Sequence, residues 1–211
     1  MAKKDPENLK DKIYSSILND IIVGRYLPGD ILNTNDLIEE YDVSRSPVRD
    51  ALISLCSDGV LKSLPRYGYE IVRLSQEDIQ NMVHFRAYIE SGNICANLDK
   101  FGDEQLRILK RINADCIRDD VRPEQHWNYN TRFHLYLMEV CGNAYVTEQI
   151  QHCMSRLLRA YAQVYWNYGN GRKLSIDTKN HEKIIDSIRE RNQDKIIRYL
   201  NEDLNDFAMG I

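Results

Sequence analysis

The spacing of hydrophobic residues predicts short amphipathic helices at the beginning of the chain. In NLKDKIYSSILNDIIV (residues 8–23) apolar positions recur three and four residues apart, and Gly24 follows as a stop signal. The turn-forming pair at 28–29 leads into a short extended piece at 30–32. A second, short helix is predicted at 33–42, capped by the side chain of its first or second residue.

The next stretch, VSRSPVRDAL (43–52), predicts a third helix with two unlike faces. Ser44 is a favourable N-cap residue, and the proline in the first turn removes no intrahelical hydrogen bond. The inward apolar face consists of Val48, Ala51, Leu52 and Leu55. On the opposite side Arg45, Ser46 and Arg49 lie near the N-terminus, where they are available to a partner outside the fold.

The segment that follows predicts a β-hairpin. Two β-prone runs at 60–64 and 69–72 are joined by Pro-Arg-Tyr-Gly at 65–68. Three helices followed by a hairpin with a basic tip are typical of a winged helix-turn-helix, whose third helix enters the major groove of DNA.

The remainder of the chain has helical spacing almost to its end. Helices are predicted from Ser75 onward and at 102–117, 123–140, 144–167, 177–190 and 193–208. No strand pattern occurs in this half. We therefore predict a mainly α protein with an N-terminal winged helix-turn-helix domain (1–75) and a C-terminal all-helical bundle (76–211).

Composition is compatible with two folded, largely helical domains. The 211 residues are 43% hydrophobic and 28% charged, and they include only 10 Gly and 5 Pro. Five widely spaced cysteines without a CxxC pair predict reduced thiols in a cytosolic protein. Because no apolar run approaches the roughly 18 residues of a membrane span, we expect a cytoplasmic location and no membrane partner.

The net charge of −4 is unusual for a protein that binds nucleic acid, but the local charge differs. Residues 43–73 carry five Lys or Arg against three Asp or Glu, a balance of +2, so the rest of the chain carries −6. The charge distribution permits DNA binding by the winged helix without establishing it.

Three stretches together resemble the GntR family of bacterial transcription regulators: GRYLPGDIL, VSRSPVRDAL and LCSDGVLKSLPRYGYEIVRLS. The match covers nearly all of residues 9–74. The helical second half resembles the FadR-like subfamily, which carries an FCD effector domain. The resemblance implies a homodimer that binds double-stranded operator DNA, with repression favoured. It also implies a small-molecule effector, usually a carboxylate, bound in the helical domain.

We expect DNA contacts from Ser44, Arg45, Ser46, Arg49, Arg66 and Gly68. The resemblance places Arg45 and Arg49 where the family's operator-contacting arginines lie, with the two serines as phosphate or base partners and Gly68 at the wing tip. An arginine can pair with the N7 and O6 edge of guanine, and serine hydroxyls at a helix N-terminus can hold phosphates.

The resemblance also implies a metal site, at positions that this chain alters. Metal-binding FCD domains share an Asp-x-x-x-His pair on one helix and two later histidines. The corresponding residues here are Asn130, His134, His181 and Asp203, so two of the four differ. The set still offers two imidazoles and one carboxylate, which suits one divalent ion such as Zn, Ni or Mn. Alternatively, the two histidines line a polar pocket without metal.

Four residues are candidates for effector binding: Arg86, Arg156, Tyr161 and Tyr165. Arg86 matches an arginine commonly found on the first helix of the family's effector domain, although an ion pair with Glu90 four residues later is an equally open interpretation. The tyrosines belong to an aromatic stretch whose helical spacing also fits simple packing.

Two other functions compete with ligand-controlled DNA binding. A histidine-rich metal site could activate water, which would make the protein a metal-dependent hydrolytic enzyme. However, no HExxH, GxSxG or phosphate-cradling glycine loop occurs, so we predict that it is not an enzyme. The altered positions 130 and 203 keep open a helical interaction module that has lost effector control.

Overall fold

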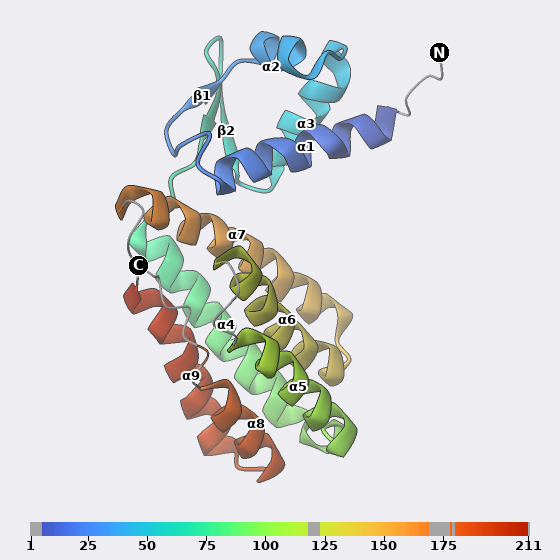
Figure 1. Ribbon diagram of the computed structural model, residues 1–211, viewed down its shortest axis with the longest axis vertical. Helices are drawn as coiled ribbons and strands as arrows, with labels where there is room; N and C mark the ends of the chain where they lie inside the picture. The colour runs from blue at the N-terminus through green and yellow to red at the C-terminus, as the bar shows by residue number, and fades with distance from the viewer. Residues whose placement is uncertain (1–5, 118–122, 169–177, 179, 211) are drawn as a thin grey trace. The chain divides into compact units, whose positions relative to one another are not determined.

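The computed structural model describes the backbone of residues 6–117, 123–168, 178 and 180–210. The chain forms two compact units (Figure 1). The N-terminal unit comprises residues 1–74 together with 161–170, and the helical unit comprises 75–160 together with 171–211. The predicted fold class is confirmed: a small helical unit with a β-hairpin is followed by an all-helical unit.

The N-terminal unit combines three helices and a small sheet. Its elements are α1 (Pro6–Ile22), β1 (Ile31–Leu32), α2 (Thr34–Tyr41), α3 (Arg45–Ser57), β2 (Leu61–Leu64) and β3 (Gly68–Ile71). The strands are antiparallel in the order β1-β3-β2, with Ile31 opposite Glu70 and Leu61 opposite Ile71. These bounds agree closely with the elements that the hydrophobic spacing predicts.

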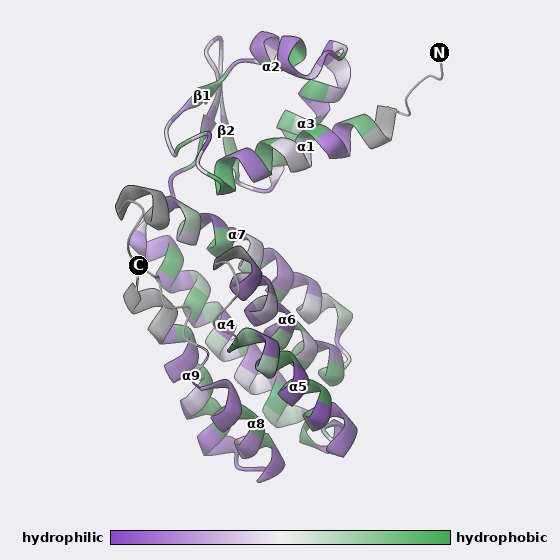
Figure 2. Ribbon diagram, in the orientation of Figure 1, coloured by the Kyte–Doolittle hydropathy of each residue, from purple (hydrophilic) through white to green (hydrophobic). Residues whose placement is uncertain are grey.

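One apolar core holds this unit together. Ile13, Ile17 and Ile21 recur every four residues on α1, so they share one face of the helix, and that face is buried. They belong to the same core as Leu52 and Leu55, which are fully buried on α3. In Figure 2 these helices carry hydrophobic and hydrophilic residues in alternation, as amphipathic helices do.

The wing differs from the prediction at Gly68. We expected this glycine at the tip, but the tip is formed by residues 65–67 and Gly68 is the first residue of β3, opposite Leu64. Gly68 has a φ of 132°, and a Cβ added there would lie 2.5 Å from the backbone oxygen of Leu32. The glycine is therefore required because the backbone of β1 approaches closely, and this requirement comes from the fold.

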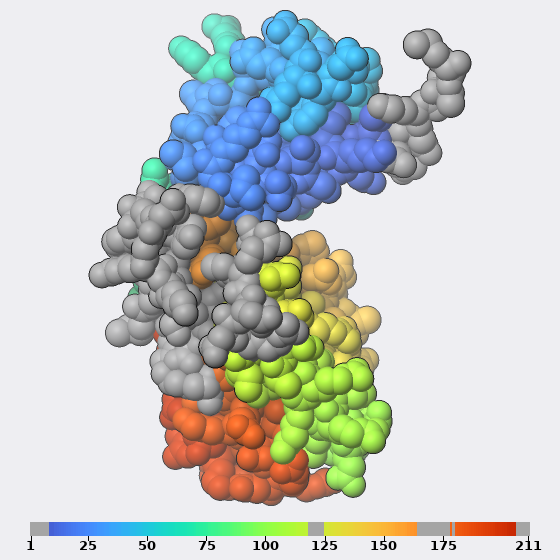
Figure 3. All heavy atoms as spheres, viewed as in Figure 1, coloured from blue at the N-terminus to red at the C-terminus, as the bar shows by residue number. Residues whose placement is uncertain are grey.

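The helical unit consists almost entirely of α-helices. They are α4 (Gln76–Ala96), α5 (Asp103–Cys116), α6 (Pro123–Cys141), α7 (Ala144–Tyr168), α8 (His181–Arg189) and α9 (Gln193–Gly210), with a 3₁₀ turn at Leu98–Lys100. Helix α4 packs against α6 and α9, while α5 packs against α6 and α8. The space-filling view shows α8 and α9 forming a continuous surface (Figure 3).

Local sequence explains where α4 begins. The Ser75 hydroxyl accepts a hydrogen bond from the backbone N–H of Asp78, and the Asp78 carboxylate accepts one from the backbone N–H of Ser75. This capping box satisfies two backbone donors that the first turn of a helix leaves without partners. Within the described ranges, none of the helices is long and apolar enough to cross a membrane.

Candidate functional site

The N-terminus of α3 offers polar side chains to solvent. Arg45, Ser46 and Arg49 are exposed, whereas Val48 on the same helix is fully buried. Ser44 occupies the N-cap position in extended backbone, but its hydroxyl makes no capping hydrogen bond. That hydroxyl therefore remains available for a phosphate or a base, and the positive end of the helix points in the same direction.

Asn35 is a residue of this surface that sequence reasoning missed. Its Oδ1 accepts a hydrogen bond of 2.9 Å from Nη2 of Arg45, which fixes the guanidinium across the gap between α2 and α3. Asn35 is exposed in the first turn of α2, two residues after the N-cap residue Asn33. A polar side chain at the start of the helix that precedes the arginines was the available signal.

We expect Asn35→Ala to weaken operator binding while leaving the fold intact. The substitution removes one neutral acceptor from Arg45, and such a hydrogen bond contributes about 0.5–1.5 kcal/mol, so the dissociation constant should rise roughly 2- to 12-fold. Fluorescence anisotropy with operator duplex measures the effect. Asn97→Ala, in the helical unit, serves as the control, and equal affinities for both variants would show that Asn35 does not position Arg45.

The wing tip adds two exposed side chains, Arg66 and Tyr67. Arg66 adopts a positive φ of 71°, and the backbone N–H of Tyr67 donates to the Leu64 carbonyl, which closes the turn. Tyr67 is 75% exposed, so it is a large aromatic side chain presented to solvent at the end of the hairpin. Of the predicted wing residues, Arg66 is thus positioned for an external contact, whereas Gly68 serves the sheet.

The interior of the helical unit contains a cluster of polar side chains from four helices. Its members are Arg86 and Glu90 on α4, Asn130 and His134 on α6, His181 on α8 and Asp203 on α9. All six are buried, with exposed fractions between 0% and 8%. The structure therefore brings together His134, His181 and Asp203, three of the four residues predicted as metal ligands, and it buries the fourth, Asn130, one helical turn before His134 on α6.

The two histidines and the aspartate face a common centre. One potential ligand atom from each of His134, His181 and Asp203 lies within 4.8 Å of the others. His134 Nε2 is 3.3 Å from Asp203 Oδ2, and His181 Nε2 is 3.7 Å from Asp203 Oδ1. The ring of Phe133 stacks on the His181 ring with centroids 3.7 Å apart, which restrains the orientation of that imidazole.

Four buried atoms of this cluster make no hydrogen bond within the described part of the chain. They are Asn130 Oδ1, His134 Nε2, His181 Nε2 and Asp203 Oδ1. Buried polar atoms normally have partners, and leaving one without any costs about 1–3 kcal/mol. These four atoms come one from each predicted ligand, and all are chemically able to coordinate a cation.

The second nitrogen of each imidazole is engaged. His134 Nδ1 is 2.7 Å from Glu90 Oε2, and His181 Nδ1 is 3.1 Å from Asn113 Oδ1. Both partner atoms are acceptors, so each Nδ1 carries a proton and each Nε2 faces the centre. Burial alone would lower the pKa of His134, but the Glu90 carboxylate outweighs it and raises that pKa, so a cation binding at Nε2 of His134 would displace a proton from it. Metal-ligating histidines are typically oriented in this way by a carboxylate or carbonyl behind the ring. Neither Glu90 nor Asn113 was anticipated in this role.

Burial and neighbouring charges set the protonation of the cluster. Burial, together with the charges of His134 and Arg86, holds the pKa of His181 well below its ordinary value, so this imidazole is neutral. Burial alone would raise the pKa of Glu90, but Arg86 and His134 outweigh it and lower that pKa. Burial raises the pKa of the Asp203 carboxyl. A divalent cation at the centre would favour the carboxylate form of Asp203.

Of the residues predicted to bind an effector, Arg86 and Arg156 have different surroundings in the helical unit. Arg86 Nε donates to Glu90 Oε1 at 2.8 Å, so the ion pair foreseen as an alternative does form, beside the histidines. Arg156 is exposed and lines a surface cavity instead. Tyr161 is buried and belongs to the N-terminal unit, and the side chain of Tyr165 lies outside the described residues.

Comparison with known proteins decides what the two units are. Residues 9–71 match the family model of the bacterial regulatory proteins of the gntR family, and residues 81–206 match the model of the FCD domain. The chain belongs to the GntR family and carries an FCD domain. The resemblance noted in the sequence is thereby confirmed for both halves, and the protein is a DNA-binding transcription regulator.

Relatives and solved structures agree with this assignment. The chain is 23% identical over 199 residues to the uncharacterized HTH-type transcriptional regulator YdhC of Bacillus subtilis, covering 91% of this chain and 88% of that protein. It is 25% identical over 197 residues to the gluconate operon transcriptional repressor of Bacillus licheniformis, covering 88% and 78%. The structure of E. coli McbR/YncC superimposes with a TM-score of 0.72 at 18% identity, covering 97% and 95%.

Proposed function

We propose that this GntR regulator is a homodimeric repressor that binds its operator through Arg45 and Arg49 and releases it when a small carboxylate occupies a metal-containing site in the FCD domain. The observation that carries the proposal is a set of four buried nitrogen and oxygen atoms that could coordinate a metal and that have no hydrogen-bond partner among the described residues. They come from Asn130, His134, His181 and Asp203, which lie on three helices, and ligand atoms of the last three lie within 4.8 Å of one another.

The mixture of nitrogen and oxygen ligand atoms fits a divalent transition-metal ion. Two neutral imidazoles, one carboxylate and one amide oxygen would hold Zn²⁺, Ni²⁺ or Mn²⁺, whereas Mg²⁺ and Ca²⁺ prefer oxygen ligands alone. Asn130 is a neutral ligand at the position where the family pattern has a carboxylate, and Asp203 supplies that charge from α9. The bound ion would act as a Lewis acid and attract an anionic ligand group.

Arg86 supplies a second feature that suits an anion. Its Nε is held by Glu90, while its Nη2 is buried and has no hydrogen-bond partner in the described structure. A carboxylate could accept from Nη2 at low cost, because the guanidinium is already ordered and desolvated. Glu90 thus fixes Arg86 on one side and His134 on the other, so one residue positions both the candidate effector-binding group and a candidate metal ligand.

Operator binding explains why a homodimer is proposed. A helix-turn-helix dimer places two reading helices one turn of DNA apart, and each helix reads one half-site of a palindrome. One copy offers DNA the exposed residues Arg45 and Arg49 of α3, and a second copy doubles the number of phosphate and base contacts. An effector then acts if it binds better to the arrangement that does not fit the operator.

A carboxylate screen tests the effector proposal. In metal-loaded protein at least one member of a panel of monocarboxylates, dicarboxylates and sugar acids should reduce operator affinity about 5- to 150-fold, and chelation of the metal should abolish the response. Sugar acids belong in the panel because one relative is a gluconate operon repressor. Anisotropy titrations with operator duplex provide the readout.

Arg86→Lys is the matched variant for this screen. It keeps a positive charge beside Glu90 but lacks the second guanidinium nitrogen, so it should retain the metal and lose most of the carboxylate response. A response that survives both chelation and this substitution would place the effector elsewhere. Turnover of a carboxylate by the purified protein would favour the enzyme instead.

A further inference from the structure

A single side chain of α7 holds the backbone of Leu74. The Leu74 N–H donates a hydrogen bond of 3.0 Å to Oε1 of Gln163, and the Leu74 carbonyl oxygen accepts one of 2.8 Å from Nε2 of Gln163. Leu74 is the last residue of the N-terminal unit, and Gln163 lies in the segment 161–170, which belongs to the same unit. The two residues are 89 positions apart, so the fold and not the neighbouring sequence produces this contact.

The contact depends on the carboxamide group of glutamine. A carboxamide presents an acceptor and a donor side by side, as a peptide group of a neighbouring strand would. Leu74 is buried, with 5% of its surface exposed, so its two backbone groups need partners within the protein. An ionised glutamate could not donate to the carbonyl oxygen, and a methionine could serve neither group. Among side chains of this length, glutamine is the one that satisfies both.

The junction between β3 and α4 (residues 72–75) is held residue by residue. Arg73 Nη2 donates to a backbone carbonyl oxygen in the loop between α1 and β1 at 3.1 Å. Leu74 is held by Gln163, and Ser75 begins the capping box of α4. Consecutive residues of the junction are thus fixed to different elements. A backbone restrained in this way passes a displacement on to its neighbours, whereas an unattached segment would absorb it.

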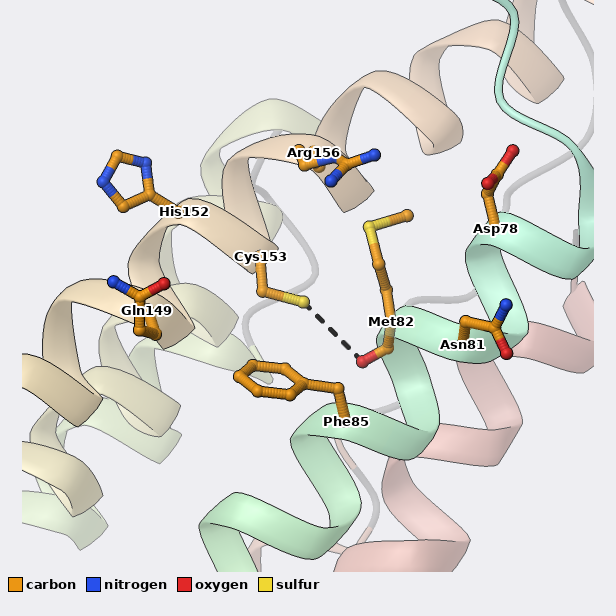
Figure 4. Close-up of a pocket in the computed structure, with 8 residues that line it drawn as sticks. All are labelled: Asp78, Asn81, Met82, Phe85, Gln149, His152, Cys153 and Arg156. Atoms are coloured by element: carbon orange, nitrogen blue, oxygen red, sulfur yellow. Dashed lines mark hydrogen bonds between the residues drawn. The ribbon is translucent and has the colours of Figure 1, made fainter. Parts of the chain in front are cut away.

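Helix α7 continues from Gln163 into the helical unit, to which its residues 144–160 belong. There Cys153 Sγ donates to the Met82 carbonyl oxygen of α4 at 3.6 Å, the contact that Figure 4 marks between the facing sides of the two helices. The ten residues from Cys153 to Gln163 span about 15 Å of helix. Helix α7 is therefore attached to α4 at one point and holds the junction at another.

Cys153 also lies within electrostatic reach of the interior cluster. Burial raises the pKa of its thiol to about 11, and the charges of Arg86 and Glu90 act on it as well. Met82, the partner of Cys153, precedes Arg86 by one helical turn on α4. The part of α7 that precedes the junction contact therefore passes near the residues to which we assign the effector.

We propose that Gln163 is a positioning residue through which the effector site controls operator binding. It fixes the junction to α7, so a movement of α7 on metal or effector binding displaces the junction and, with it, the wing strand that precedes it. The inference rests on the proposed function and adds the contact that transmits the signal. Coupling between distant sites is carried by packed side chains and hydrogen bonds, and this contact supplies such a link.

Hydrogen exchange of the full-length chain with and without Zn²⁺ alone tests the proposal. The reporting amides are those of Ile71 and Val72, which donate to the carbonyl oxygens of Asp30 and Val60 and make no direct use of Gln163. In the wild type, Zn²⁺ should slow their exchange about 5-fold or more, as a typical coupling between two sites would. In Gln163→Met, which keeps the side-chain length and loses both hydrogen bonds, the ratio should fall below about 2-fold.

Two further variants make the result specific. Gln163→Ala removes the same hydrogen bonds together with the side-chain packing, so it should behave like Gln163→Met. Circular dichroism reports whether each variant folds, and if the alanine variant does not, Gln163→Met decides alone. Gln151→Ala is the matched control, because Gln151 is an exposed glutamine of the same helix, and it should keep the wild-type response. A purely structural role of Gln163 would speed exchange equally with and without Zn²⁺ and leave the ratio unchanged.

The amides of α8 and α9 separate this inference from the proposed function. Zn²⁺ should slow their exchange in the wild type and in all three variants, because His181 and Asp203 are unchanged. If α8 and α9 are protected but Ile71 and Val72 of the wild type are not, the inference is overturned and the metal site stands. The same holds if the folded Gln163 variants keep the wild-type ratio. A wild type without Zn²⁺ protection in α8 and α9 would overturn the metal site itself.

Discussion

Arg49→Ala is expected to weaken binding to the cognate operator by about 1–3 kcal/mol, which corresponds to a roughly 5- to 150-fold higher dissociation constant. Arg49 is exposed near the N-terminus of α3, and its helix is fixed to the core by buried Val48 and Leu52. The loss should be smaller on a scrambled duplex, because a base contact contributes specificity and a phosphate contact does not. Anisotropy titrations at several salt concentrations, with an operator selected from random duplexes, measure both quantities.

Arg107→Ala provides the control for this prediction. Arg107 is an exposed arginine of α5, so its removal changes the net charge equally without touching the reading helix. Equal losses on operator and scrambled duplex would assign Arg49 to phosphate contact alone. An unchanged operator affinity in both Arg49→Ala and Arg45→Ala would refute the assignment of α3 as the reading helix.

The second large effect concerns stability in the presence of metal. An ion that binds only the folded chain adds about 4.1 kcal/mol to its stability at a free concentration of 1,000 times the dissociation constant. For a protein of this size that corresponds to a rise in melting temperature of roughly 10 °C. His134→Ala should abolish this metal-dependent rise, because it removes one of the two imidazole ligands. Thermal unfolding with and without Zn²⁺, Ni²⁺ or Mn²⁺ measures the shift.

The metal-induced shift, and not the absolute melting temperature, is the proper readout. His134→Ala also leaves a space beside Glu90, so the metal-free variant is expected to be less stable for reasons unrelated to metal. His152→Ala is the matched control, since the side chain of His152 is 65% exposed on α7. An equal metal-induced shift in wild type, His134→Ala and His152→Ala would indicate binding at the surface only.

Much of the fold was predictable because local signals and packing agree. The spacing of Ile13, Ile17 and Ile21 predicts α1, and the same residues form its buried face. Ser75 with Asp78 three residues later predicts the start of α4, where both hydrogen bonds of the capping box form. These features depend on neighbours in sequence, so the sequence displays them directly.

The features that were missed or misplaced depend on contacts between distant segments. The reason for Gly68 is the backbone of β1 at Leu32, which no local pattern reveals. Likewise, Asn113 lies 68 positions from the His181 ring that it orients. Arg156 was grouped with Arg86 because both are cations on helices, but helical rotation places Arg156 on the surface. Such assignments require the relative rotation and depth of helices, which spacing alone does not supply.

Native mass spectrometry of the full-length chain, after incubation with Zn²⁺, Ni²⁺ or Mn²⁺ and removal of excess ion, tests the metal-centred account most directly. We expect one ion per chain in the wild type and none in a variant carrying both His134→Ala and His181→Ala. The contradicting result would be a wild type that stays metal-free with every ion, or a double variant that retains as much metal as the wild type.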